Sequence, residues 1–74
     1  MNRFKLLDEL DRLNIPTAYY SIKGAMDDRI CLDEINGQWV VYYIERGKKS
    51  ELGAFSTESE ACSFMLSQLK PTVE

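Results

Sequence analysis

Apolar residues near the start of the chain recur at the spacing of an amphipathic helix. Between residues 2 and 13 charged side chains fill most of the intervening positions, and the apolar ones are Phe4, Leu6, Leu7, Leu10 and Leu13. One face of a helix shows this repeat of three and four residues. Residues 14–17 predict the end of the helix, because the residue before Pro16 avoids the α-helical backbone conformation.

Two β-prone segments follow, at residues 19–22 and 29–35, and the turn-rich residues 23–28 separate them. Tyrosine and β-branched residues favour strands, whereas glycine and aspartate favour turns. Strands joined by a short connection are usually antiparallel neighbours, so we expect a β-hairpin here.

A second hairpin has the clearest local signal in the chain. Asn36 and Gly37 precede the β-prone residues 38–44, and both tolerate the positive φ of a type I′ turn. A third turn around Gly47, also expected at positive φ, leads to a short fourth strand at residues 51–55.

The last part of the chain predicts a helix. Thr57 with Glu60 three residues later has the spacing of a capping box, which closes the first turn of a helix. Pro71 marks its end. The apolar face comprises Ala61, Cys62, Met65, Leu66 and Leu69. We therefore expect one α+β domain over residues 1–74, in the order α-β-β-β-β-α, with an antiparallel four-stranded meander and both helices packed on one face.

The two-residue turn determines which strand residues share a face. Leu32 then pairs with Val41, and Ile30 pairs with Tyr43. We assign this face, which also holds Trp39, to the core beneath the helices. The complete predicted core is Phe4, Leu7, Leu10, Ile30, Leu32, Trp39, Val41, Tyr43, Met65 and Leu69.

The opposite face carries an apolar row where a sheet covered on one side is expected to be polar. We interpret this row as the apolar centre of a partner-binding surface. The centre consists of Val40, Tyr42 and Ile44. Tyr20 and Ile22 extend it if the first hairpin pairs in regular register without a bulge. Its predicted acidic rim is Asp27, Asp28, Asp33 and Glu34. The alternative is that the first helix or the C-terminal tail covers the row.

Composition and charge narrow the range of partners. The 74 residues are 45% hydrophobic and 28% charged, as in a globular domain, with a net charge of −3. Negative charge disfavours nucleic acid and anionic membranes and permits a basic protein partner, although mild acidity also serves solubility. Charges interrupt every apolar stretch before it reaches the length of a signal peptide or membrane span, so we expect a cytoplasmic protein.

Residues that carry catalysis or bind metals are scarce. The chain has no histidine, and we expect its two cysteines, Cys31 and Cys62, to be reduced and buried rather than paired. Because histidine is the commonest general base and metal ligand, we expect no catalytic activity, no metal site and no cofactor. The order of elements is also that of double-stranded RNA-binding domains, but the second helix opens with Glu58 and Glu60 instead of basic residues.

Four segments carry a resemblance to a known family, namely residues 19–24 (YYSIKG), 29–32 (RICL), 39–47 (WVVYYIERG) and 55–62 (FSTESEAC). Together they resemble small bacterial immunity proteins of polymorphic toxin systems. The resemblance implies a protein that neutralises a cognate toxin, commonly a nuclease, by binding it tightly, and it brings no catalytic site. The alternative is a structural or regulatory module that forms a homodimer or larger homo-oligomer through the open sheet face.

Overall fold

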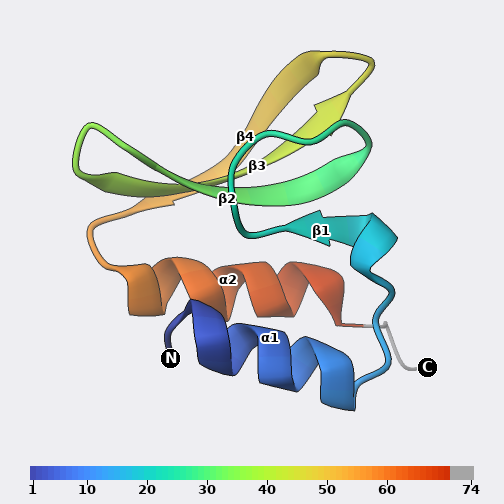
Figure 1. Ribbon diagram of the computed structural model, residues 1–74. Helices are drawn as coiled ribbons and strands as arrows, with labels where there is room; N and C mark the ends of the chain where they lie inside the picture. Colours follow the sequence, from blue (N-terminus) through green and yellow to red (C-terminus); the bar gives the residue numbers. More distant parts are fainter. Residues whose placement is uncertain (71–74) are drawn as a thin grey trace.

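The computed structural model describes residues 1–70 and contains two α-helices, a short 3₁₀ helix and four strands (Figure 1). In chain order these are α1 (Arg3–Arg12), η1 (Thr17–Tyr19), β1 (Tyr20–Ser21), β2 (Arg29–Ile35), β3 (Gln38–Glu45), β4 (Lys48–Phe55) and α2 (Glu58–Leu69). The strands are ordered β1-β2-β3-β4, and both helices lie on one side of the sheet (Figure 1). The predicted α+β class and element order are confirmed.

Polar side chains cap the N-terminal ends of both helices. The Asn2 side chain accepts a hydrogen bond from the Lys5 N–H at 2.9 Å and caps α1. Thr57 accepts one from the Glu60 N–H at 3.2 Å, which confirms the predicted cap of α2. The predicted stop at Pro71 lies outside the described residues.

The buried face of α1 is centred on Leu6 and Leu10, which are fully buried. Phe4 is 75% exposed, so its predicted place in the core was wrong. At about 100° per residue, Phe4 lies about 200° around the helix from Leu6. Because Leu6 and Leu10 face the helix-side core, Phe4 points to solvent.

The β2–β3 hairpin has the predicted register. Ile30 pairs with Tyr43 and Leu32 with Val41. The backbone φ is 51° at Asn36 and 82° at Gly37, as a type I′ turn requires.

The β3–β4 hairpin turns at Gly47, whose φ of 80° is positive as predicted. β4 begins at Lys48, earlier than the predicted strand at residues 51–55. A bulge leaves Leu52 as the additional residue, because Val41 pairs with Gly53 while Tyr42 pairs with Glu51.

The predicted first hairpin was wrong, because β1 runs parallel to β2, with Tyr20 beside Ile30. Parallel neighbours usually need a crossover of a dozen or more residues. Here β1 has only two residues, so the chain returns to the start of β2 through residues 22–28 alone. In Figure 1 this β1–β2 loop rises past β2 to the side of the sheet opposite the helices.

Two apolar clusters occupy the two faces of the sheet. The helix-side cluster comprises Leu6, Leu10, Ile15, Tyr20, Leu32, Val41, Ala61, Cys62, Met65 and Leu66. Several predicted core residues are only partly buried against it: Leu7, Ile30, Trp39 and Leu69. The loop-side cluster comprises Cys31, Val40, Tyr42 and Ile44. Both cysteines are free and buried, as predicted.

Candidate functional site

The predicted apolar centre is not an open surface. Val40, Tyr42 and Ile44 are 8%, 2% and 4% exposed, although they lie on the face away from the helices. The β1–β2 loop covers them. The Cys31 thiol donates to the Met26 carbonyl at 3.4 Å, and the Asp28 N–H donates to the Ile44 carbonyl at 2.7 Å.

The two residues expected to extend that row lie on the other face. Tyr20 belongs to the helix-side cluster, and Ile22 packs against the same cluster. The reason is the parallel pairing of β1, which places Tyr20 beside Ile30 and therefore on the helix-covered face. The predicted centre is thus divided between two faces, and its apolar residues are largely covered.

The predicted acidic rim is also divided. Asp27 and Asp28 are exposed in the loop before β2, whereas Asp33 and Glu34 lie near the other end of that strand. Glu34 follows Asp28 by six positions along the extended chain, which places the two residues about 20 Å apart. The four carboxylates therefore do not form one continuous patch.

Asp33 has a structural partner instead. Its carboxylate accepts a hydrogen bond from the Tyr42 hydroxyl at 3.3 Å, and the Lys49 ammonium lies 4.8 Å from the centre of the Tyr42 ring. Burial, together with the negative charge of Asp33, raises the pKa of Tyr42 from 10.0 to about 12. Tyr42 is therefore protonated at neutral pH and stabilises the loop-side cluster.

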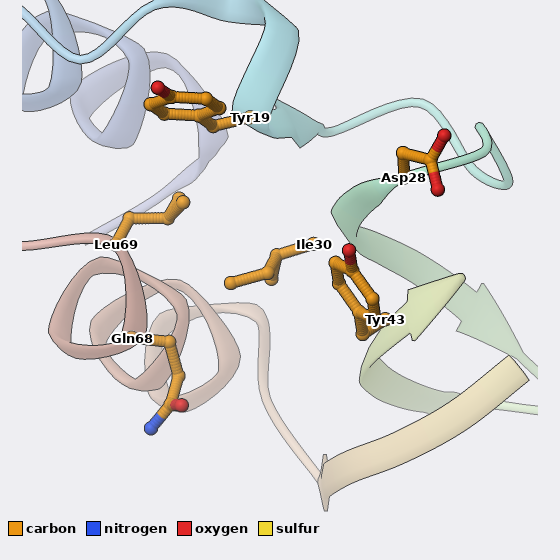
Figure 2. Close-up of a pocket in the computed structure, with 6 residues that line it drawn as sticks. All are labelled: Tyr19, Asp28, Ile30, Tyr43, Gln68 and Leu69. Carbon is orange, nitrogen blue, oxygen red and sulfur yellow. The ribbon is translucent and has the colours of Figure 1, made fainter. Parts of the chain in front are cut away.

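A cleft of about 360 Å³ opens on the helix side of the sheet, where α2 ends. Figure 2 shows the side chains that line this α2-end cleft, which are Tyr19, Asp28, Ile30, Tyr43, Gln68 and Leu69. Ile30 and Leu69 point toward one another across it, with Tyr19 on one side and Tyr43 on the other (Figure 2).

The register and the length of α2 create this cleft. Ile30 and Tyr43 are paired neighbours at the end of the β2–β3 hairpin farthest from its turn. Gln68 and Leu69 are the last two residues of α2, so the helix does not extend over the whole pair. Ile30 and Tyr43 consequently remain partly exposed.

The walls of the cleft are aromatic and apolar, and its rim accepts hydrogen bonds. Tyr19 is 60% exposed at the end of η1. Asp28 stands at the edge with a φ of 59°, and its N–H is held by the Ile44 carbonyl. Such a cleft can bind a side chain with an apolar stem and a polar or cationic end.

The sequence predicted Asp28 as a binding residue but missed the rest of the cleft. Its lining comes from η1, the β1–β2 loop, β2, β3 and α2, which are adjacent only in the folded chain. Tyr43 and Leu69 follow core periodicity, so the pattern assigned them to the interior. The type I′ turn did predict that Ile30 pairs with Tyr43. No local sequence pattern, however, predicts that α2 ends above this pair.

Two further properties of residues 1–70 concern metal binding and membrane-spanning helices. The described part of the chain has no group of three or more His, Cys, Asp or Glu side chains placed to hold a metal ion. Neither of its α-helices is long and apolar enough to span a membrane.

Comparison with models of protein families, with curated proteins and with solved structures gave no match to this chain.

Proposed function

We propose that this chain is a protein-binding domain that acts as a bacterial immunity protein. In this role it neutralises a basic toxin domain, such as a nuclease, by tight binding in the cytoplasm. The observation that carries the proposal is the α2-end cleft of this acidic domain, which is lined by the rings of Tyr19 and Tyr43, both at least partly exposed, and by the carboxylate of Asp28, which lies on the Tyr43 side (Figure 2). The resemblance of residues 39–47 and 55–62 to immunity proteins adds the biological context.

In such inhibition, charge determines how fast the two proteins associate, and buried aromatic side chains determine how slowly they dissociate. An acidic domain with a net charge of −3 associates faster with a basic enzyme because the charges attract at long range. Aromatic anchors that lose their water in the complex slow dissociation. Tyr19 supplies such an anchor because most of its side chain is accessible before binding.

The test begins with the gene immediately upstream, where we expect a large secreted protein with a variable C-terminal domain. That C-terminal domain should arrest growth when it is expressed alone in the cytoplasm. Co-expression of this chain should restore growth, and the two purified proteins should form a complex in surface plasmon resonance. A toxin domain from an unrelated system is the matched control, against which the chain should give no protection.

Failure to restore growth, with both proteins soluble and expressed, would contradict the immunity role. Binding to the toxin without restored growth would also contradict it. The charge argument is tested separately by salt. Association of an acidic inhibitor with a basic enzyme should become slower as ionic strength rises, while dissociation changes little.

A homodimer is the second candidate, and the outer edge of β4 favours it. Residues 48–52 of this edge strand are exposed, and an unpaired strand edge can pair with a second copy. Lys48 and Lys49 oppose such pairing, as does the bulge at Leu52. Analytical ultracentrifugation at micromolar concentration separates the two candidates, because a monomer favours the immunity role and a stable dimer favours self-association.

A further inference from the structure

We propose that the α2-end cleft receives an arginine side chain of the partner, which rests on the proposed function for the identity of that partner. Arginine combines an apolar stem with a planar cation that stacks on aromatic rings and donates hydrogen bonds in a fork. Each of these properties has a counterpart among the residues that line the cleft.

The first counterpart is the carboxylate of Asp28. Its exposed side chain takes part in neither of the ion pairs formed within residues 1–70. Its backbone is fixed, since the Asp28 N–H donates to the Ile44 carbonyl at 2.7 Å and thereby holds the loop against β3. Asp28 therefore offers a positioned acceptor for a guanidinium.

The second counterpart is the C-terminal end of α2, to which Gln68 and Leu69 belong. The free carbonyl groups at the end of a helix carry partial negative charge and favour a cation nearby. The last turn of α2 contains no basic residue. Lys70 follows the helix as its C-cap residue, and its charge, after that of Arg12, helps to lower the pKa of Glu9 in α1.

The third counterpart is the pair of tyrosines. Tyr19 and Tyr43 stand on either side of the apolar floor made by Ile30 and Leu69 (Figure 2). An arginine stem packs on such a floor while its guanidinium stacks on a ring. A lysine ammonium is compact and strongly hydrated, so the same walls favour arginine over lysine.

The protein's own Arg29 lies close to this region. Its guanidinium donates to the carbonyls of Thr17 and Tyr20 at 3.1 and 3.5 Å, so its hydrogen-bonding groups are partly engaged by the backbone of η1 and β1. Its positive charge weakens the attraction for a second cation. The carboxylate of Asp28 and the end of α2 must therefore act together for arginine to bind.

The test is a titration of the ¹⁵N-labelled full chain by nuclear magnetic resonance, with the capped tripeptide acetyl-Gly-Arg-Gly-amide. We expect saturable shifts of the amides of Tyr19, Asp28, Ile30, Tyr43 and Leu69. The same tripeptide with citrulline is the control, because citrulline keeps the shape of arginine and lacks its charge. It should bind about tenfold more weakly, and the lysine tripeptide should also bind more weakly than the arginine one.

A pair of variants tests the role of Asp28. Asp28→Asn should weaken binding of the arginine tripeptide about tenfold. Asparagine accepts positive φ, so the loop conformation at Asp28 is retained. Asp27→Asn is the matched control, because it removes the same charge from an adjacent exposed residue outside the cleft, and it should change affinity by less than about twofold.

Three outcomes overturn the proposal: shifts that do not saturate in the cleft, equal affinity for arginine and citrulline, or equal effects of the two variants. These outcomes leave the immunity role untouched, because growth protection is measured with the toxin and not with the tripeptide. Conversely, arginine binding in the cleft without growth protection supports the cleft assignment and contradicts the immunity role.

Discussion

The two faces of the sheet are both apolar, but they are covered in different ways. On one face α2 packs against β2, β3 and β4, and α1 packs against α2. On the other face the irregular β1–β2 loop covers Cys31, Val40, Tyr42 and Ile44. A short loop can thus replace a second layer of helices when the cluster beneath it is small. The open apolar face expected from the sequence is absent because this loop occupies its place.

The two covers are attached with different strength. The helices have their own backbone hydrogen bonds, and the ion pair of Arg3 with Glu58 at 3.2 Å joins α1 to α2. The loop is attached by few bonds, among them the Ser21 hydroxyl to the Gly24 carbonyl and the Gly24 N–H to the Leu32 carbonyl. A cover with few buried apolar contacts opens locally at low free energy. We therefore expect the loop-side cluster to be the less stable one.

The largest effect is expected from truncating adjacent valines of β3. Val41 is fully buried in the helix-side cluster, and Val40 is 8% exposed in the loop-side cluster. Val41→Ala should lower the free energy of unfolding by about 2–3 kcal/mol, because it leaves a cavity between sheet and helices. Val40→Ala should cost about 1 kcal/mol, since the loop can settle into the space. Urea denaturation measures both, and equal losses would contradict the comparison.

The alkylation rates of the two buried thiols measure how readily the loop and the helices move away from the sheet. Burial raises the pKa of Cys31 beneath the loop and of Cys62 beneath the helices. Alkylation of Cys31 needs only local opening of the loop, whereas Cys62 needs separation of the helices from the sheet. Cys31 should therefore react about tenfold faster with N-ethylmaleimide, a ratio that corresponds to about 1.4 kcal/mol in opening free energy. Mass spectrometry of tryptic peptides distinguishes the sites, and faster reaction at Cys62 would reverse the argument.

Local signals explain why much of the fold was predictable. Asn36 and Gly37 set the register of β2 and β3, and that register placed Leu32 with Val41 on the helix-covered face. The capping box at Thr57 fixed the start of α2. These features depend on neighbours a few residues apart, so the pattern contains the necessary information.

The unpredicted features depend on contacts that the local pattern does not contain. Whether β1 runs parallel to β2 depends on where η1 delivers the chain, and the β-prone residues 19–22 fit either direction. The cover of the loop-side cluster comes from residues 23–28, whose composition indicates only a turn. The α2-end cleft needs both of these arrangements together with the end of α2. The predicted apolar row is therefore covered and divided between two faces, although the predicted pairing of β2 with β3 was confirmed.

Gly47 lies outside both apolar clusters, so a substitution there measures the effect of backbone conformation alone on stability. Its φ is 80°, and a Cβ atom added there would meet no atom within 4 Å. Gly47→Ala should therefore destabilise the protein by about 1 kcal/mol through strain alone. Gly37→Ala, at a φ of 82° and also in open space, is the matched case in the other hairpin and should cost a similar amount. An unchanged melting temperature for both variants would contradict this.

The smallest effect at neutral pH is expected at Tyr42, where the loop-side cluster contains a titratable group. Tyr42→Phe removes the hydrogen bond to Asp33 but keeps the buried ring, so the cost at pH 7 should be about 0.5 kcal/mol. The cost should change in alkaline solution. Burial and the charge of Asp33 raise the pKa of Tyr42 to about 12 in the folded chain, against 10.0 ordinarily.

Between pH 10 and 12 the unfolded chain releases the Tyr42 proton and the folded chain retains it, so the wild-type free energy of unfolding falls with rising pH. The contribution is fully present below pH 10 and is lost as the pH rises through the folded pKa. Tyr42→Phe lacks this group, so the stability of wild type relative to this variant should decline across the window. Tyr43→Phe is the control on the opposite face of β3, and it should retain the wild-type decline because Tyr42 is still present. Urea denaturation from pH 9 to 12 measures the difference, and parallel curves for wild type and Tyr42→Phe would show that the loop leaves the Tyr42 hydroxyl open to water.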